Sequence, residues 1–179
     1  MTPLPRPDFP RARSQSAPAP RRAVTASRPP VPFNPDHFVR QVSRLNSLAV
    51  SVHHLALRRT GNGDIRAYAR HMADSHAWLN EALLTLLEKA GSSLMPDYQP
   101  EPARQGELDA LSEDDEAHFD IDYMMFQNRL YLDMLRLCER FLHARTAMPN
   151  LVIYALTLCD YLTYHLKQFS PALGARQTA

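Results

Sequence analysis

The chain has 179 residues and a net charge of only +1, and 45% of its residues are hydrophobic. This composition allows one packed domain with tails. Its five glycines are scattered, which excludes the glycine-rich phosphate loops of nucleotide-binding proteins. No apolar run approaches the ~20 residues of a membrane span, and no apolar segment near the start predicts a secretory signal peptide.

Residues 1–35 predict a disordered tail. Ten of the fifteen prolines lie there with serine, alanine and arginine, and such a segment cannot bury enough apolar surface to fold. Residues 1–32 contain six arginines and one acid, so they carry +5 and leave −4 for the remainder. Because few aromatic residues accompany these arginines, we expect no nucleic-acid binding beyond a weak attraction to phosphate groups.

Two amphipathic helices are predicted next, at 36–59 and 63–90. Asn34 and Pro35 are typical of a helix start, and Gly91 is typical of a helix end. Apolar residues recur at spacings of three and four, at Phe38, Val42, Leu45, Ala49, Val52 and Ala56, and then at Ile65, Ala69, Met72, Leu79, Leu83 and Leu86. The glycine-rich turn between the helices predicts an antiparallel hairpin.

The polar link at 92–115 is long enough to cross the bundle from end to end, and its stretch "RQGELDALS" favours a short helix. A third long helix is predicted at 114–145, with Ser112 as a cap and the acidic "SEDDE" at the positive end of its dipole.

A fourth helix is predicted at 149–169 and a flexible C-terminus at 171–179. Residues 36–170 therefore predict an all-α fold, a ferritin-like four-helix bundle of two antiparallel hairpins with a long crossover.

Two histidines, His76 and His165, lie on the apolar stripes of their helices. Ferritin-like di-metal sites need Glu-x-x-His on two helices and a further Glu on each of the others, and this chain has no Glu-x-x-His. We therefore interpret His76 as a buried neutral imidazole that is hydrogen-bonded to a facing helix. Its candidate partners are Tyr131, Gln127, Asn46 and His165.

Metal binding is the alternative interpretation of these histidines. A divalent ion (iron, manganese or zinc) would use His76 and His165, with additional ligands from His53, His54 or Asp160. Two imidazoles alone hold such an ion weakly, because protein sites usually supply three or four ligands. No other cofactor is expected.

Other chemistry is not indicated. The chain has no nucleophile elbow and no His-Glu-x-x-His motif, so no catalytic residue is predicted. The tyrosines of the last two helices are interpreted as surface residues of the bundle. Cys138 and Cys159 should be offset by about one helical turn, or roughly 6 Å, so a disulfide is not expected.

Three motifs resemble those of a known family. They are "LALRRTGNGDIRAYARHMADSHAWLNEAL", "HFDIDYMMFQNRLYLDML" and "YLTYHL". The matching residues are Leu55, Ala56, Ala69, Met72, His76, Phe119, Asp120, Tyr123, Leu162, His165 and Leu166. In this order, over residues 36–170, the chain resembles DUF4142, a bacterial family of ferritin-like domains of unknown function.

The resemblance implies a ferritin-like fold and a family site built from one glutamate and three histidines. The family's acidic position falls at Ala49 or Ser51 here, and one of its histidine positions falls at Tyr131. Only His76 and His165 are retained, which implies a degenerate metal site. The resemblance implies export, because relatives are commonly exported, but no signal peptide is predicted here. The protein is therefore expected either in the cytoplasm or exported without a classical signal peptide.

Three functions follow as hypotheses. The first is a non-catalytic interaction or stress-related bundle that binds an unknown protein partner or a second copy of itself. The second is a metal-binding bundle that uses the core histidines. The third is a bacterial secreted effector or export accessory whose N-terminal segment is the export signal.

Overall fold

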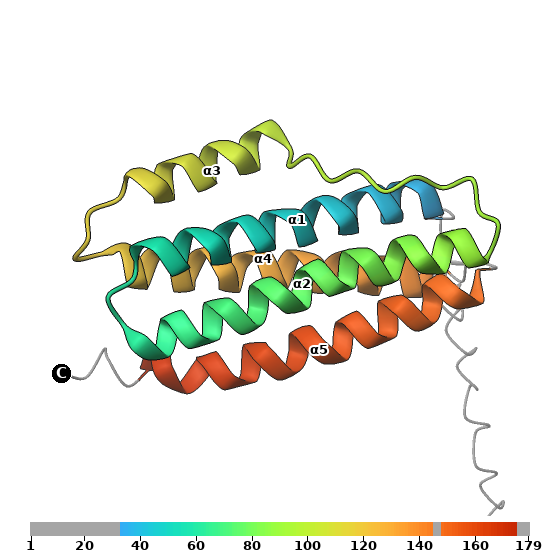
Figure 1. Ribbon diagram of the computed structural model, residues 1–179. Helices are drawn as coiled ribbons and strands as arrows, with labels where there is room; N and C mark the ends of the chain where they lie inside the picture. The colour runs from blue at the N-terminus through green and yellow to red at the C-terminus, as the bar shows by residue number, and fades with distance from the viewer. Residues whose placement is uncertain (1–32, 145–147, 175–179) are drawn as a thin grey trace, which may run out of the picture.

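The computed structural model describes residues 33–144 and 148–174, which form a helical bundle (Figure 1). Its helices are α1 (Pro35–Arg59), α2 (Gly63–Lys89), α3 (Pro102–Glu113), α4 (Phe119–His143) and α5 (Pro149–Gly174). The hairpins α1–α2 and α4–α5 are joined by a long crossover that carries α3, as Figure 1 shows. The predicted ferritin-like arrangement is confirmed. The predicted tail lies outside the described residues up to position 32, and Pro35 already belongs to α1.

The ends of α1 and α2 follow from local capping. The side chain of Asn34 accepts a hydrogen bond from the backbone N–H of Asp36 at 3.0 Å, and Asn62 caps α2 in the same way through Asp64 at 2.9 Å. Each cap satisfies an N–H group that the first helical turn leaves without a partner. After α2 the chain reverses at Gly91, whose φ of 59° lies in the left-handed region that glycine adopts without steric cost.

The start of α4 differs from the prediction. We placed the third long helix at 114–145 with Ser112 as its cap, whereas α4 begins at Phe119 and Ser112 belongs to the last turn of α3. The predicted short helix within the link is confirmed as α3. Arg59 donates hydrogen bonds to the backbone carbonyls of Ser112 and Asp114, so a partner from another helix holds the acidic stretch in a turn.

The last helix is longer than predicted. It runs to Gly174, whereas we expected it to end at residue 169 and expected flexibility from residue 171. Residues 145–147 and 175–179 lie outside the described part of the chain.

The core lies along the bundle axis between the four long helices. α1 packs on α2 and on α4, and α4 packs on α5, whereas α2 and α5 contact each other sparsely. At one end the rings of Phe38 and Phe141 stack at 4.0 Å between centroids and join α1 to α4. None of the described helices has the length and apolarity of a membrane span.

Cys138 and Cys159 are both free thiols. Their side chains are hydrogen-bonded to each other between α4 and α5, and no disulfide joins them, as predicted.

Candidate functional site

His76 is fully buried, and both of its ring nitrogens are hydrogen-bonded. Nδ1 lies 3.0 Å from Oδ1 of Asn46 on α1, and Nε2 lies 2.9 Å from the hydroxyl of Tyr131 on α4. The amide nitrogen of Asn46 donates to Tyr154 of α5 at 3.0 Å, and the Tyr154 hydroxyl donates to the carbonyl of Leu79 on α2. The predicted hydrogen-bonded imidazole is confirmed, with two of its four candidate partners.

His53 lies two helical turns after Asn46 on α1 and extends this network. Its Nδ1 lies 2.8 Å from the Tyr123 hydroxyl, and its Nε2 lies 3.3 Å from the Tyr131 hydroxyl. The rings of His53 and His76 stack at 5.7 Å between centroids. Gln127, another candidate partner of His76, instead donates to Tyr68, which is hydrogen-bonded to Tyr131.

The direction of each hydrogen bond follows from one end of this network. The Leu79 carbonyl can only accept, so Tyr154 donates to it and accepts from the Asn46 amide. Oδ1 of Asn46 therefore faces His76, whose Nδ1 must carry the proton.

Since His76 is neutral, its Nε2 accepts from Tyr131, and the Tyr131 oxygen accepts from Nε2–H of His53. Nδ1 of His53 then accepts from Tyr123. The two stacked rings are therefore opposite tautomers.

Burial keeps both rings neutral. Desolvation, with a smaller contribution from His165, lowers the pKa of His76 from its ordinary value of 6.5 to about 3. Burial also lowers the pKa of His53 well below that value, and the neighbouring His76 acts in the same direction. A charge at either ring would be costly, because the surrounding core has no carboxylate in hydrogen-bond contact with the two rings.

The predicted metal ligands are only partly brought together. His53 and His76 are neighbours, and His165 lies beyond Tyr161, whose ring is 5.9 Å from His76 and 4.4 Å from His165. His54 and Asp160 are exposed on the outside of the bundle. Among residues 33–144 and 148–174, no group of three or more His, Cys, Asp or Glu side chains is arranged to hold a metal ion.

The donor set around His76 does not fit the metal site that the resemblance implies. All four ring nitrogens of His53 and His76 already take part in hydrogen bonds within the core. An ion could be bound there only by breaking these bonds, and no carboxylate of the described residues is hydrogen-bonded to either ring to balance its charge. The site is therefore a neutral polar network inside the bundle.

His165 has a different environment from His76. It is 7% exposed and is surrounded by Tyr161, Tyr164 and Tyr68, and the exposed His71 of α2 lies 6.1 Å away between ring centroids. Within the described part of the chain, its ring makes aromatic contacts and no hydrogen bond. Burial, together with His71, lowers its pKa.

The tyrosines of the last two helices are only partly as predicted. Tyr131 is one of the predicted partners of His76, but Tyr123 and Tyr154 are also buried members of the network, whereas we interpreted the tyrosines of these helices in general as surface residues. The prediction failed because a buried tyrosine needs a partner for its hydroxyl, and the partners come from other helices. One signal was present along α1 and its C-cap, where Asn46, His53 and Thr60 recur every seven residues and are all buried.

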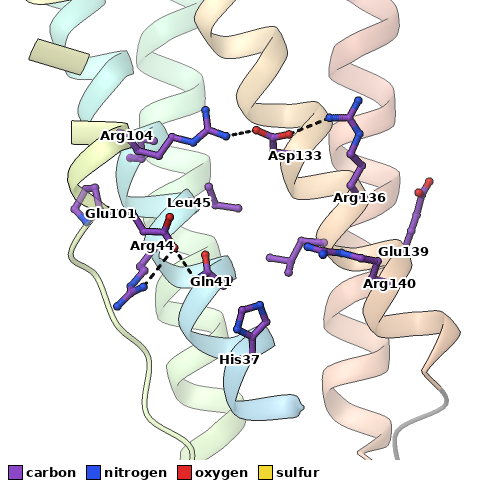
Figure 2. Close-up of a pocket in the computed structure, with 13 residues that line it drawn as sticks. His37, Gln41, Arg44, Leu45, Glu101, Arg104, Asp133, Arg136, Glu139 and Arg140 are labelled. Atoms are coloured by element: carbon purple, nitrogen blue, oxygen red, sulfur yellow. Dashed lines mark hydrogen bonds and ion pairs between the residues drawn. The ribbon is translucent and has the colours of Figure 1, made fainter. Parts of the chain in front are cut away.

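A charged groove lies on the outside of the bundle, between α1, α4 and the start of α3 (Figure 2). It has a volume of about 620 Å³ and charged walls. Gln41 donates to Glu101 at 2.8 Å, and Asp133 accepts from both Arg104 and Arg136, as Figure 2 shows. Because its opposite charges pair with one another, this groove fastens the crossover to the bundle, and it contains none of the predicted site residues.

Comparison with solved structures supports the fold class. The chain is similar to the crystal structure of a DUF305 fragment from Deinococcus radiodurans, with a TM-score of 0.67 and 18% sequence identity. The match covers 81% of this chain and 99% of that one. No curated protein matches the chain.

Fold and site together define a helical bundle with a neutral, hydrogen-bonded histidine pair in its core. The family model of DUF4142, a domain of unknown function, matches residues 19–170. The chain belongs to the DUF4142 family, as its three motifs predict.

Proposed function

We propose that this protein is a non-catalytic interaction bundle, in which the buried histidines hold the helices together. One observation carries the proposal: every ring nitrogen of His53 and His76 is hydrogen-bonded inside the core. A ring in this state has no free lone pair for a metal and no proton exposed to a substrate. The network joins α1, α2, α4 and α5, so it favours one arrangement of the four helices.

The proposal is supported by the energetics of the network. A buried polar group without its partner costs about 1–3 kcal/mol, so helix arrangements that separate Tyr131 from the histidines are penalised. Function would then lie on the outer faces of the bundle, where a protein partner binds.

Elemental mass spectrometry of protein purified without chelator tests this proposal. We expect no stoichiometric iron, manganese or zinc, and no turnover of hydrogen peroxide. Near-stoichiometric metal that disappears in the His53→Gln/His76→Gln variant would contradict it, because the ion would then occupy the network. Circular dichroism of the variant separates loss of metal from loss of fold.

A second candidate function is metal binding at His165, and it is favoured by one arrangement. His71 and His165 face each other across α2 and α5, at the partly open side of the bundle. Two imidazoles at this separation could share a soft or borderline divalent ion whose other ligands are water.

Isothermal titration with zinc distinguishes the two candidates. Binding at His165 predicts that the His71→Ala/His165→Ala variant loses zinc affinity and that the His53→Gln/His76→Gln variant keeps it. Equal affinity in all three proteins would rule out the second candidate.

A further inference from the structure

The single tryptophan of the chain lies in a groove between α2 and α5. The groove has a volume of about 280 Å³ and opens where the two helices contact each other sparsely. Its lining residues are Asp74, Ser75, Trp78, Leu79, Thr157 and Tyr161. Trp78 is 60% exposed, and an open aromatic side chain beside a groove is typical of a binding surface.

Apolar surface continues from the groove along the outer side of α5. Ile153 and Tyr164 are 62% and 60% exposed, and Leu156 is also exposed. No charged residue occurs from Pro149 to Cys159. A helix that is apolar on both its inner and its outer side is typically covered by other protein on both sides. The outer side of α5 therefore indicates a binding surface for a further protein segment.

The charges beside the groove indicate what kind of occupant fits. Asp74 lines the groove, Asp160 is exposed next to Tyr161, and Glu81 is exposed about one helical turn after Trp78. An aromatic floor with acids at its edge favours an apolar segment that carries positive charge. A second copy of the same face would place acid against acid.

The chain carries a segment with this chemistry. Residues 1–32 contain six arginines and one acid, and Leu4, Pro7, Pro10 and Arg13 recur every third residue. A polyproline helix has three residues per turn, so these four side chains would share one face. Proline-rich segments bind aromatic-lined grooves through such a face. We propose that residues 4–13 of the same chain bind the α2–α5 groove, with the prolines on Trp78 and Arg13 at Asp74.

The connecting chain has a suitable length. Phe33 packs against His37 at the start of α1, which is the same end of the bundle as the C-terminal end of α2. Trp78 lies eleven residues before Lys89, which is about 16 Å along the helix axis. The distance across the bundle, at right angles to that axis, is about 20 Å, so the direct span is roughly 25 Å. Nineteen residues, 14–32, separate the proposed segment from Phe33, and five of them are prolines. At about 3.1 Å per residue for a proline-rich chain they are long enough to cross this span, so binding within one molecule is favoured by a high effective concentration.

Fluorescence of Trp78 tests the proposal in the full-length protein, because no other tryptophan contributes. We expect acrylamide to quench Trp78 weakly in dilute salt. In the variant Arg11→Glu/Arg13→Glu the quenching constant should rise about twofold, because the released segment uncovers the indole. The matched control Arg21→Glu/Arg22→Glu has the same change of charge in the linker and should quench like the unmodified protein.

Three results would overturn the proposal. The first is strong quenching in the unmodified protein, and the second is equal quenching in all three proteins. The third is protection that depends on protein concentration and accompanies a dimer in light scattering, since a second copy would then cover the face. The inference does not depend on the proposed function, because metal content and Trp78 quenching are measured independently.

Discussion

At the residue scale, the buried network depends most on Tyr131. Its hydroxyl accepts from His53 and donates to His76, and it is also hydrogen-bonded to Tyr68. A hydroxyl has one proton and two lone pairs, so all of its hydrogen-bonding capacity is used. The side chain is fully buried, and water cannot replace it without opening the core.

Replacing Tyr131 by phenylalanine should therefore destabilise the fold strongly. The change leaves Nε2 of His76 and Nε2–H of His53 without partners, and each buried group costs about 1–3 kcal/mol. We expect the free energy of unfolding in urea to fall by about 2–5 kcal/mol. Tyr164→Phe, at a 60% exposed position, is the control and should change it by less than about 0.5 kcal/mol. A similar small change in Tyr131→Phe would mean that the network is not formed.

The lowered histidine pKa values predict a loss of stability in acid. The unfolded chain binds these protons near the ordinary pKa of 6.5, whereas the folded chain holds His76 neutral down to about pH 3. The stabilising effect of the neutral ring is therefore complete above pH 6.5 and decreases as the pH falls toward 3.

Each such ring contributes a slope of about 1.4 kcal/mol per pH unit within that window. Urea unfolding between about pH 6 and pH 4 should show this slope, and the slope should be smaller by about that amount in His76→Gln. An unchanged slope in the variant would show that the pKa of His76 is not lowered in the folded protein.

At the element scale, the helix ends can be tested through two glycines. Gly91 has a positive φ of 59° after α2, whereas Gly106 lies inside α3 with open space around its Cα. Gly91→Ala should destabilise the protein by about 1–2 kcal/mol, because an L side chain is strained in this conformation. Gly106→Ala should be neutral or stabilise it by up to about 1 kcal/mol. Thermal unfolding of both variants checks the prediction, and the reverse order would contradict the described helix ends.

The contact of α4 with α5 can be tested through the thiols. The hydrogen bond to Cys159, together with burial, raises the pKa of Cys138, whereas the same hydrogen bond lowers the pKa of the half-buried Cys159. Because the thiolate is the reactive form, iodoacetamide should modify Cys159 first. Peptide mass spectrometry of a short reaction measures the order. Equal rates would indicate that the two side chains do not contact each other.

Most elements could be predicted from local signals, and the exceptions have local causes. The apolar stripes of α1 and α2 and their asparagine caps are contained within each segment, so both helices begin and end within one residue of the prediction. The start of α4 depends on Arg59, which is distant in the chain. The spacing of apolar residues within one helix carries no information about a contact with a distant residue.

The site could be predicted only in part for the same reason. His76 lies on an apolar stripe, and this predicted burial and a polar partner. His53 lies beside the main stripe of α1, so its stacking on His76 was not predicted. The hydroxyls of Tyr123 and Tyr131 have partners on another helix, which only the packed bundle defines.

At the scale of the whole molecule, one hydrogen-bonded network replaces the ligands that the family resemblance implies. Asn46 and His53 come from α1, His76 from α2, Tyr131 from α4 and Tyr154 from α5. At the position where the resemblance implies a family histidine, this chain has Tyr131, whose hydroxyl is hydrogen-bonded to His53 and His76. The two histidine rings are neutral, whereas acidic side chains lie at the exposed edge of the α2–α5 groove.

The tautomers of His53 and His76 test this account most directly. Long-range nitrogen–proton correlation spectra of the full-length protein at pH 7 report which ring nitrogen carries the proton. We predict a neutral Nδ1–H form for His76 and a neutral Nε2–H form for His53, as the hydrogen bonds to Asn46 and Tyr131 require. Identical tautomers, a doubly protonated ring, or signals displaced by a bound metal would contradict a closed structural network.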